Sequence, residues 1–209
     1  MTALSTLEQD ARTAGVPYFD PDDYLINAIR RATAHGQDLR VRADGFGELV
    51  VASGRGEYFT SIADMAAFCR LPVTRLRVSL DQRGATPAGT GRNIDELMWS
   101  AAFHASDGRL MLGCYRDDVV ELRHWPNFTR LPHTPNSLRI AALLVQHPTS
   151  VTLAARLLKI EREELYQFYS AARSAGLARA VNRKPEEPKL APHRHQTLLA
   201  ALLNKIAGI

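Results

Sequence analysis

The sequence predicts an α+β protein in which an N-terminal antiparallel sheet with covering helices precedes a C-terminal helical module and a terminal amphipathic helix. Three observations predict this class. Residues 39–80 contain several short segments of alternating polarity, residues 137–175 contain three runs with helical spacing, and prolines punctuate the stretch between them. A chain of 209 residues is long enough for one large domain or two small domains that each bury a core.

The N-terminal part begins with a predicted helix. Asp20 supplies an N-cap and Pro21 favours the first helical position, so the helix is expected to begin here and to end at Gly36. Strand-like alternation follows, and it predicts an antiparallel meander. The three predicted strands cover 39–43, 48–52 and 57–61.

The predicted order then continues with a helix over 62–70 and a strand over 73–80. Residues 82–92 are rich in Gly, Pro, Thr and Arg and are the first candidate for a functional loop. Asn93 can cap the next helix, which Asp107 and Gly108 should end. A hairpin made from residues 109–115 and 119–125 is expected to extend the same sheet.

Prolines after residue 125 indicate a module boundary near residue 133, so the first module is predicted to comprise residues 1–133. Beyond it the sequence predicts helices over 137–147, 151–160 and 161–175 and a strand over 177–181. Residues 185–195 have the composition of a linker.

Residues 196–209 are expected to form a short amphipathic helix. An isolated helix of this length is marginal in water, so we expect it to dock or to pair, and a homodimer is predicted. The predicted contact residues form one stripe: Leu199, Leu202, Leu203 and Ile206.

The segment from Pro148 to Ile160, followed by Glu161 to Leu177, resembles the helix-turn-helix core of winged-helix proteins. The resemblance is confined to residues 137–184, and we assign residues 134–184 to a winged-helix-like module. Small and apolar residues of the second helix, a brief turn after Ile160 and the closing pair Gly176 and Leu177 carry it. The resemblance implies that the third helix could present its start to base edges while flanking groups hold phosphates.

Acidic residues at the start of the predicted third helix argue against that use. Glu161, Glu163 and Glu164 suit the positive end of the helix dipole, but they would repel a phosphate backbone. We therefore favour a protein-interaction module and keep nucleic-acid binding as an alternative. The candidate nucleic-acid-binding residues are Arg162, Gln167, Ser170, Arg173, Arg179, Arg183 and Lys184.

The charge is divided unevenly along the chain. Residues 1–136 have a net charge of −2 and residues 137–209 have a net charge of +6, so an anionic partner suits the C-terminal part. In the first part, arginines at alternating strand positions could clamp a nucleotide or phosphorylated ligand, although a solvated face paired with nearby acids is the favoured interpretation. These four arginines are Arg40, Arg42, Arg75 and Arg77.

The sequence contains no recognisable catalytic or metal-binding motif, so no catalytic residue, metal ion or cofactor is predicted. Cys69 and Cys114 lack a CxxC spacing and are expected to be packed thiols. The segment Trp125–Phe128 is interpreted as a packing anchor between modules. No membrane span and no secretory signal are evident, which leads us to expect a cytoplasmic protein.

The leading hypothesis is a non-enzymatic regulatory or signalling protein that acts through protein contacts, with a protein partner expected. One alternative is a DNA-binding transcription regulator whose N-terminal module senses a ligand. The other is a receptor for an anionic, nucleotide-like ligand.

Overall fold

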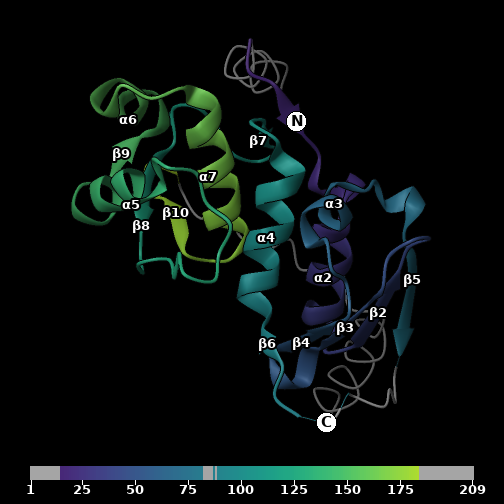
Figure 1. The fold of residues 1–209 in the computed structure, drawn as a ribbon. Coiled ribbons are helices and arrows are strands. Elements are labelled where there is room, and N and C mark those ends of the chain that lie inside the picture. Colours follow the sequence, from purple (N-terminus) through teal and green to yellow (C-terminus); the bar gives the residue numbers. More distant parts are fainter. Residues whose placement is uncertain (1–14, 82–86, 88, 184–209) are drawn as a thin grey trace, which may run out of the picture.

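The computed structural model describes residues 15–81, 87 and 89–183, and its helices and antiparallel strands confirm the predicted α+β class. Figure 1 shows α4 (Ile94–Ser106) in the middle of the molecule. Helices α2 (Leu25–Ala34) and α3 (Met65–Arg70) pack on one side of α4, and α7 (Arg162–Ser174) packs on the other. The two parts of the chain therefore meet along one buried helix.

The larger sheet contains five antiparallel strands in the order β5-β2-β3-β4-β6. In sheet order, they are β5 (Arg77–Asp81), β2 (Asp38–Arg42), β3 (Glu48–Ala52), β4 (Glu57–Thr60) and β6 (Arg92–Asn93). Strands β2, β3 and β4 form the predicted meander, with Leu39 opposite Val51 and Val51 opposite Tyr58. These apolar residues are buried, and α2 packs over β2, so the helices cover one face of the sheet.

The predicted helix at residue 20 is interrupted. Asp20 does act as an N-cap, because its carboxylate accepts a hydrogen bond from Asp22 N at 2.9 Å, but it caps only the short 3-10 turn η1 (Pro21–Asp23). Tyr24 then adopts an extended backbone and α2 begins at Leu25. The ring of Tyr24 packs edge-on against Phe19, so tertiary packing overrides the local helix signal.

The predicted strand over 73–80 is shorter than expected. The turn η3 (Val73–Arg75) occupies its first residues, and β5 begins at Arg77. Arg75 consequently lies outside the strand. The helix before it also begins late, because Asp64 caps α3 by accepting a hydrogen bond from Ala67 N at 2.9 Å.

The ends of α4 agree with the prediction. The Asn93 side chain accepts a hydrogen bond from Asp95 N at 2.7 Å and caps the first turn. Asp107 and Gly108 end the helix with φ angles of 46° and 79°, in the left-handed region that glycine adopts readily.

The predicted hairpin over residues 109–125 is wrong. Strand β7 (Leu110–Met111) pairs in parallel with β1 (Tyr18–Phe19), whereas β8 (Val119–Leu122) pairs with strands of the C-terminal part. Two turns separate β7 from β8, since Cys114 N bonds to Met111 O and Asp118 N bonds to Tyr115 O. Neither strand extends the five-stranded sheet.

The C-terminal part contains the three predicted helices and a small sheet in the order β10-β8-β9. Its elements are α5 (Ser137–Gln146), β9 (Thr149–Ser150), α6 (Val151–Leu158), α7 and β10 (Ala178–Ala180). Strand β8, which precedes residue 133, is the middle strand of this sheet. The division predicted at residue 133 therefore does not follow the sheets.

One continuous apolar core joins the two parts. Trp99 of α4 is fully buried at their junction, and its ring packs edge-on against Phe168 of α7 with centroids 5.5 Å apart. Its indole N–H donates to Pro132 O at 2.9 Å. A buried tryptophan with a satisfied N–H fixes the position of α7 and of the segment before α5 relative to α4.

Candidate functional site

The middle of α7, the third helix of the predicted winged-helix-like module, is covered. No residue from 164 to 172 is exposed. Ser170 is fully buried and its hydroxyl accepts a hydrogen bond from Met111 N at 3.0 Å, while Gln167 donates to Phe103 O at 2.9 Å. Of these two candidate nucleic-acid-binding residues, Ser170 is therefore inaccessible and Gln167 is only partly exposed, because α4 and β7 pack against this face.

The other candidate nucleic-acid-binding residues do not form one surface on α7. Arg162 and Arg173 are exposed at opposite ends of the helix, about 16 Å apart along its axis. Arg179 lies on β10 and pairs with Glu121 of β8 at 2.5 Å. Lys184 lies outside the described residues.

Arg183 has a structural role. Its guanidinium pairs with the carboxylate of Asp118, which is almost fully buried, and stacks over the ring of Tyr115 at 4.2 Å. Asp118 also accepts hydrogen bonds from Tyr169 Oη at 2.8 Å and Tyr115 N at 2.8 Å. Burial, together with the neighbouring Cys114 and Asp118, raises the pKa of Tyr169, so its hydroxyl stays protonated and donates to the carboxylate.

Three of the four predicted anion-binding arginines do lie together. Arg40, Arg42 and Arg77 line a shallow hollow of about 270 Å³ with Val78 and Ser79, whereas Arg75 is on the turn η3. The three guanidinium groups already have acidic partners in the fold.

Glu48 forms ion pairs with Arg40 at 2.8 Å and with Arg42 at 2.7 Å. Arg77 forms an ion pair with Asp44 at 2.8 Å. The hydrogen bond from Arg40, with help from Arg42, lowers the pKa of Glu48. A ligand anion at this hollow would have to compete with these carboxylates. These ion pairs agree with the interpretation favoured from the sequence, in which the arginines pair with nearby acids.

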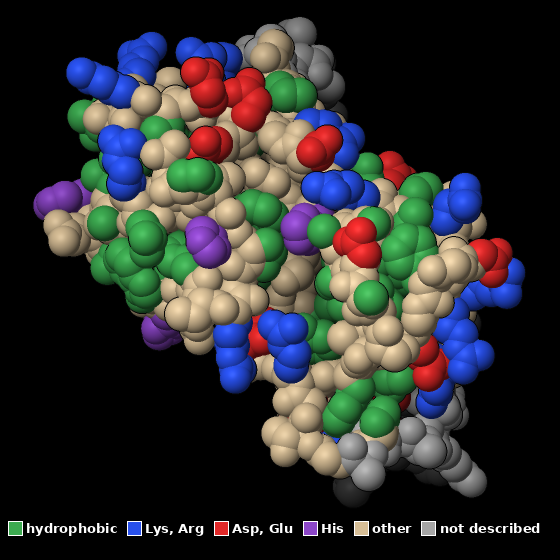
Figure 2. Space-filling model, in the orientation of Figure 1, with side chains coloured by type: hydrophobic (Ala, Val, Ile, Leu, Met, Phe, Trp, Pro, Cys, Tyr) green, Lys and Arg blue, Asp and Glu red, His purple; other side chains and the backbone are tan. Residues whose placement is uncertain are grey.

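A larger hollow lies on the C-terminal part, between α5 and the segment that precedes it. It has a volume of about 510 Å³. Trp125 and Leu138 flank it and expose 52% and 53% of their surfaces, which is unusual for side chains of this size. The lining residues are Trp125, Pro126, Asn127, Phe128, Thr129 and Leu138, and we call this site the Trp125 hollow. Figure 2 shows apolar side chains gathered over this part of the molecule.

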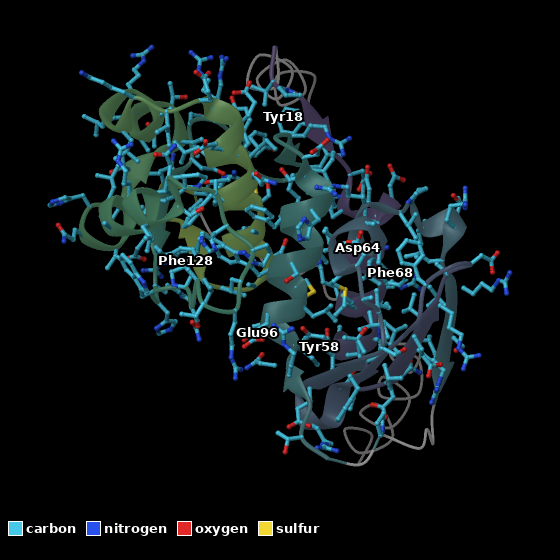
Figure 3. All side chains as sticks on the ribbon, in the orientation of Figure 1. Tyr18, Tyr58, Asp64, Phe68, Glu96 and Phe128 are labelled. Carbon is cyan, nitrogen blue, oxygen red and sulfur yellow. The ribbon has the colours of Figure 1, made fainter. Side chains whose placement is uncertain are left out.

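Phe128 anchors the Trp125 hollow to the core. Its ring lies 6.2 Å from the ring of Trp99, 6.4 Å from that of Phe168 and 6.3 Å from that of Trp125. Figure 3 shows Phe128 on the side of α4 that faces the C-terminal helices. The predicted packing anchor thus divides into two parts: Phe128 packs against both halves of the core, whereas Trp125 remains exposed.

Local hydrogen bonds hold the chain around Phe128 in one turn. The Asn127 side chain accepts from Thr129 Oγ1 at 2.6 Å, and its backbone carbonyl accepts from Arg130 N at 3.0 Å. An Asn side chain that bonds the backbone and side chain two residues later stabilises such turns.

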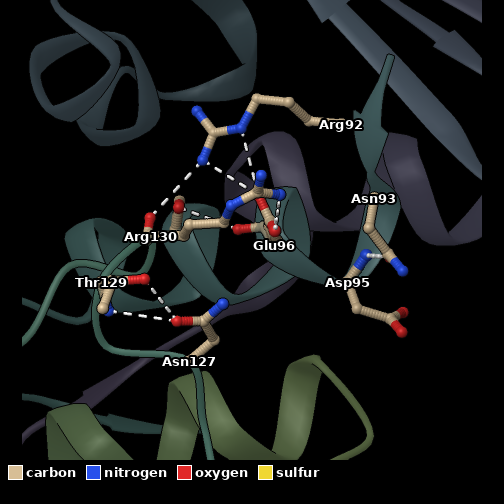
Figure 4. A network of polar contacts seen from close by, with 8 residues as sticks. Arg92, Asn93, Asp95, Glu96, Asn127, Thr129 and Arg130 are labelled. Atoms are coloured by element: carbon tan, nitrogen blue, oxygen red, sulfur yellow. Dashed lines mark hydrogen bonds and ion pairs between the residues drawn. The ribbon is translucent and has the colours of Figure 1, made fainter. Parts of the chain in front are cut away.

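Glu96 ties this turn to the rest of the molecule (Figure 4). Its carboxylate pairs with Arg130 at 3.2 Å and with Arg92 of β6 at 3.0 Å. Figure 3 places Glu96 at the end of α4 nearest the five-stranded sheet. A single carboxylate therefore links the sheet edge, α4 and the turn that lines the Trp125 hollow.

The stretch of sequence that contains the hollow is cationic. Residues 122–160 contain no Asp or Glu but five Arg or Lys residues and three His residues. Arg123, His124 and Arg130 lie beside Trp125 in the sequence and are exposed. The absence of acids over this stretch was visible in the sequence, but only the fold shows that an exposed apolar hollow lies within it.

The two thiols offer no reactive group. Cys69 and Cys114 are fully buried, and burial raises the pKa of each to about 12. Among the described residues, no group of three His, Cys, Asp or Glu side chains is arranged to hold a metal ion.

The predicted self-association stripe, Leu199, Leu202, Leu203 and Ile206, lies outside the described residues. Within the described ranges, no helix combines the length and apolar character needed to span a bilayer. Comparisons with protein-family models, curated proteins and solved structures find no match for this chain.

Proposed function

We propose that this protein is a non-enzymatic regulatory protein that acts by binding another protein, and that the Trp125 hollow accepts an apolar side chain from an acidic, amphipathic segment of that partner. The observation that carries this proposal is the exposed hollow between Trp125 and Leu138, which lies in a stretch of sequence, residues 122–160, that contains no acidic residue.

The composition of the hollow supports a protein partner. Tryptophan is enriched among the residues that contribute most to protein binding, where it fills or borders a desolvated pocket. Trp125 lines the hollow together with the apolar Phe128 and Leu138, and Asn127 and Thr129 add polar groups to the lining. An apolar centre with a polar rim is the usual anatomy of a protein interface.

The charge supports an acidic partner. Arg123, Arg130 and Arg139 lie close in sequence to the hollow and carry the same sign of charge. A partner with acidic residues around its apolar anchor would be attracted to this surface, and a basic partner would be repelled. Glu96 neutralises part of the charge of Arg130 and also fixes its position.

The burial of α7 supports protein binding over reading of a DNA groove by that helix. A recognition helix must expose several neighbouring side chains to base edges. The middle of α7 exposes none, and its exposed start carries the acidic Glu161 and Glu163. Arg179 and Arg183 pair with Glu121 and Asp118.

DNA binding through another surface is the second candidate function. Arg156, Lys159 and Arg162 are exposed around the turn between α6 and α7, and cations at such a turn can contact phosphates without a recognition helix. This candidate predicts binding that depends on these cations and not on Trp125.

The test uses the full chain and a fluorescein-labelled amphipathic peptide with leucines on one face and glutamates on the other. Fluorescence anisotropy should show saturable binding, and Trp125→Ala should weaken it by roughly 30-fold, the effect of about 2 kcal/mol expected for a central tryptophan. Leu157→Ala is the matched control, because Leu157 is equally exposed but lies on α6.

A peptide with lysines in place of glutamates should bind at least tenfold more weakly than the acidic peptide. The proposal fails if the acidic peptide does not bind, or if Trp125→Ala and Leu138→Ala leave its affinity unchanged. Salt-sensitive binding to random duplex DNA that Arg156→Glu and Arg162→Glu abolish, and that Trp125→Ala does not change, would replace it with the second candidate.

A further inference from the structure

We propose that two copies of this chain associate by pairing their β5 strands in antiparallel orientation, which joins the two five-stranded sheets into one continuous sheet. The partner is therefore a second copy of the chain, and the surface is the outer edge of β5. This inference is independent of the protein partner proposed for the Trp125 hollow.

The outer edge of β5 is open among the described residues. Strand β5 pairs with β2 along its whole length, from Arg77 opposite Arg42 to Asp81 opposite Asp38, and has no described strand on its other side. An edge strand presents a row of backbone N–H and C=O groups that another strand can bind. The opposite edge strand, β6, has only two residues.

The side chains of β5 resemble those of an inner strand. Val78 and Leu80 lie opposite Val41 and Leu39, which are fully buried, yet they expose 41% and 54% of their surfaces. Edge strands that stay unpaired are usually protected by a charge, a proline or a bulge in the middle. The central residues of β5, Val78, Ser79 and Leu80, provide none of these.

The sequence of β5 is complementary to itself in the antiparallel direction. A two-fold axis at Ser79 places Val78 of one copy opposite Leu80 of the other and Arg77 opposite Asp81. Both apolar residues then meet apolar residues across the two-fold axis. This complementarity argues for a second copy over an unrelated extended peptide.

Pairing would cover apolar surface next to the core. Val78 and Leu80 from both copies would form a cluster of four side chains on the helix-covered side of the sheet, since they share that side with Leu39 and Val41. Figure 1 shows β5 at the edge of the sheet far from α5, α6 and α7. The Trp125 hollow therefore stays accessible in the dimer.

Sedimentation velocity of the full chain over a wide concentration range tests the proposal. We expect a species with twice the 23.2 kDa mass of one chain, and we expect the double variant Val78→Lys/Leu80→Lys to be monomeric. The control is Leu153→Lys/Leu157→Lys, which changes two similarly exposed leucines on α6 and should remain dimeric. Circular dichroism checks that each variant is folded.

A cross-linking experiment tests the register. Ser79→Cys should form a dimer with a short bismaleimide, because the two-fold axis brings the two introduced thiols together. The native Cys69 and Cys114 are buried and should not react. Arg75→Cys, on η3 and outside the strand, is the control and should cross-link at least tenfold less.

Three outcomes would overturn the proposal. The first is a monomer at every concentration, and the second is a dimer that persists in Val78→Lys/Leu80→Lys. The third is a dimer that is lost only in Leu202→Lys/Leu203→Lys, which would assign association to the predicted amphipathic helix over 196–209 instead.

Discussion

The arginines on the open face of the five-stranded sheet and the cations around the Trp125 hollow meet different neighbours. On the sheet, Arg40 and Arg42 share Glu48, and Arg77 pairs with Asp44. Around the hollow, Arg130 pairs with Glu96, while the ion pairs within the described residues do not involve Arg123 or Arg139. Arginine content alone therefore does not identify a binding surface, because neighbouring carboxylates decide how much charge a partner would meet.

The largest expected effect concerns an arginine whose partner is buried. Asp118→Ala should lower the free energy of unfolding by about 3–5 kcal/mol, because it leaves Arg183 next to a buried site without a counter-charge and removes the acceptor of Tyr169. Urea denaturation measures this loss. Asp44→Ala, which breaks an exposed pair, is the control and should cost under about 1 kcal/mol. Equal losses in the two variants would contradict this distinction.

Glu96→Gln should have an intermediate effect and would sharpen the comparison directly. The glutamine keeps the shape of the side chain but loses the charge that holds Arg92 and Arg130, so we expect a loss of about 1–2 kcal/mol in unfolding free energy. Amide hydrogen exchange should become faster in the turn at residues 127–131 and stay unchanged in β2. Unchanged exchange in the turn would show that Glu96 does not fix the Trp125 hollow.

Glu48→Gln should have the smallest effect on stability. It would leave Arg40 and Arg42 without a paired carboxylate among the described residues, as Arg123 and Arg139 are near the hollow. Without this carboxylate, the positive charges of Arg40 and Arg42 are no longer compensated. The variant should therefore elute from heparin at a higher salt concentration than the original protein. The Glu48→Gln variant is also the control for the pH dependence of stability, because its glutamine does not titrate. A variant that elutes at the same salt concentration would contradict the role assigned to Glu48.

The sign of the pH effect follows from the lowered pKa of Glu48 in the folded protein. The ionised carboxylate stabilises the fold above the ordinary glutamate pKa of about 4.3, and this contribution is lost as the pH falls through the lower folded value. The unfolding free energies of the original protein and Glu48→Gln should therefore differ at pH 7 and converge in acid. A difference that grows in acid would contradict the assignment.

Local signals in the sequence predicted the elements that depend on local chemistry. The cap at Asn93, the glycine that ends α7 at Gly176 and the alternation of β2 and β3 all appear in the structure. The strand character of β8 was also visible, but its partners were not, because alternation shows that a segment is extended and not which strand it pairs with. The same limit applies to Trp125, whose exposure depends on where Phe128 packs.

The burial of Gln167 and Ser170 could not be deduced from the module that contains them. Their partners, Phe103 and Met111, belong to α4 and the strand after it, more than 50 residues earlier in the chain. A resemblance to a winged-helix unit describes the three helices, whereas the accessibility of the third helix depends on what packs against it.

The position of β8 has a consequence for synthesis of the chain on the ribosome. The strand is made before α5, α6 and α7, yet it receives β9 and β10 as neighbours only later, and Arg183 reaches back to Asp118 just before it. The small sheet therefore cannot be completed until β10 has left the exit tunnel. Until then at least the edge of β8 that pairs with β10 is open, so premature release or truncation before β10 would leave a nascent chain that chaperones must shield.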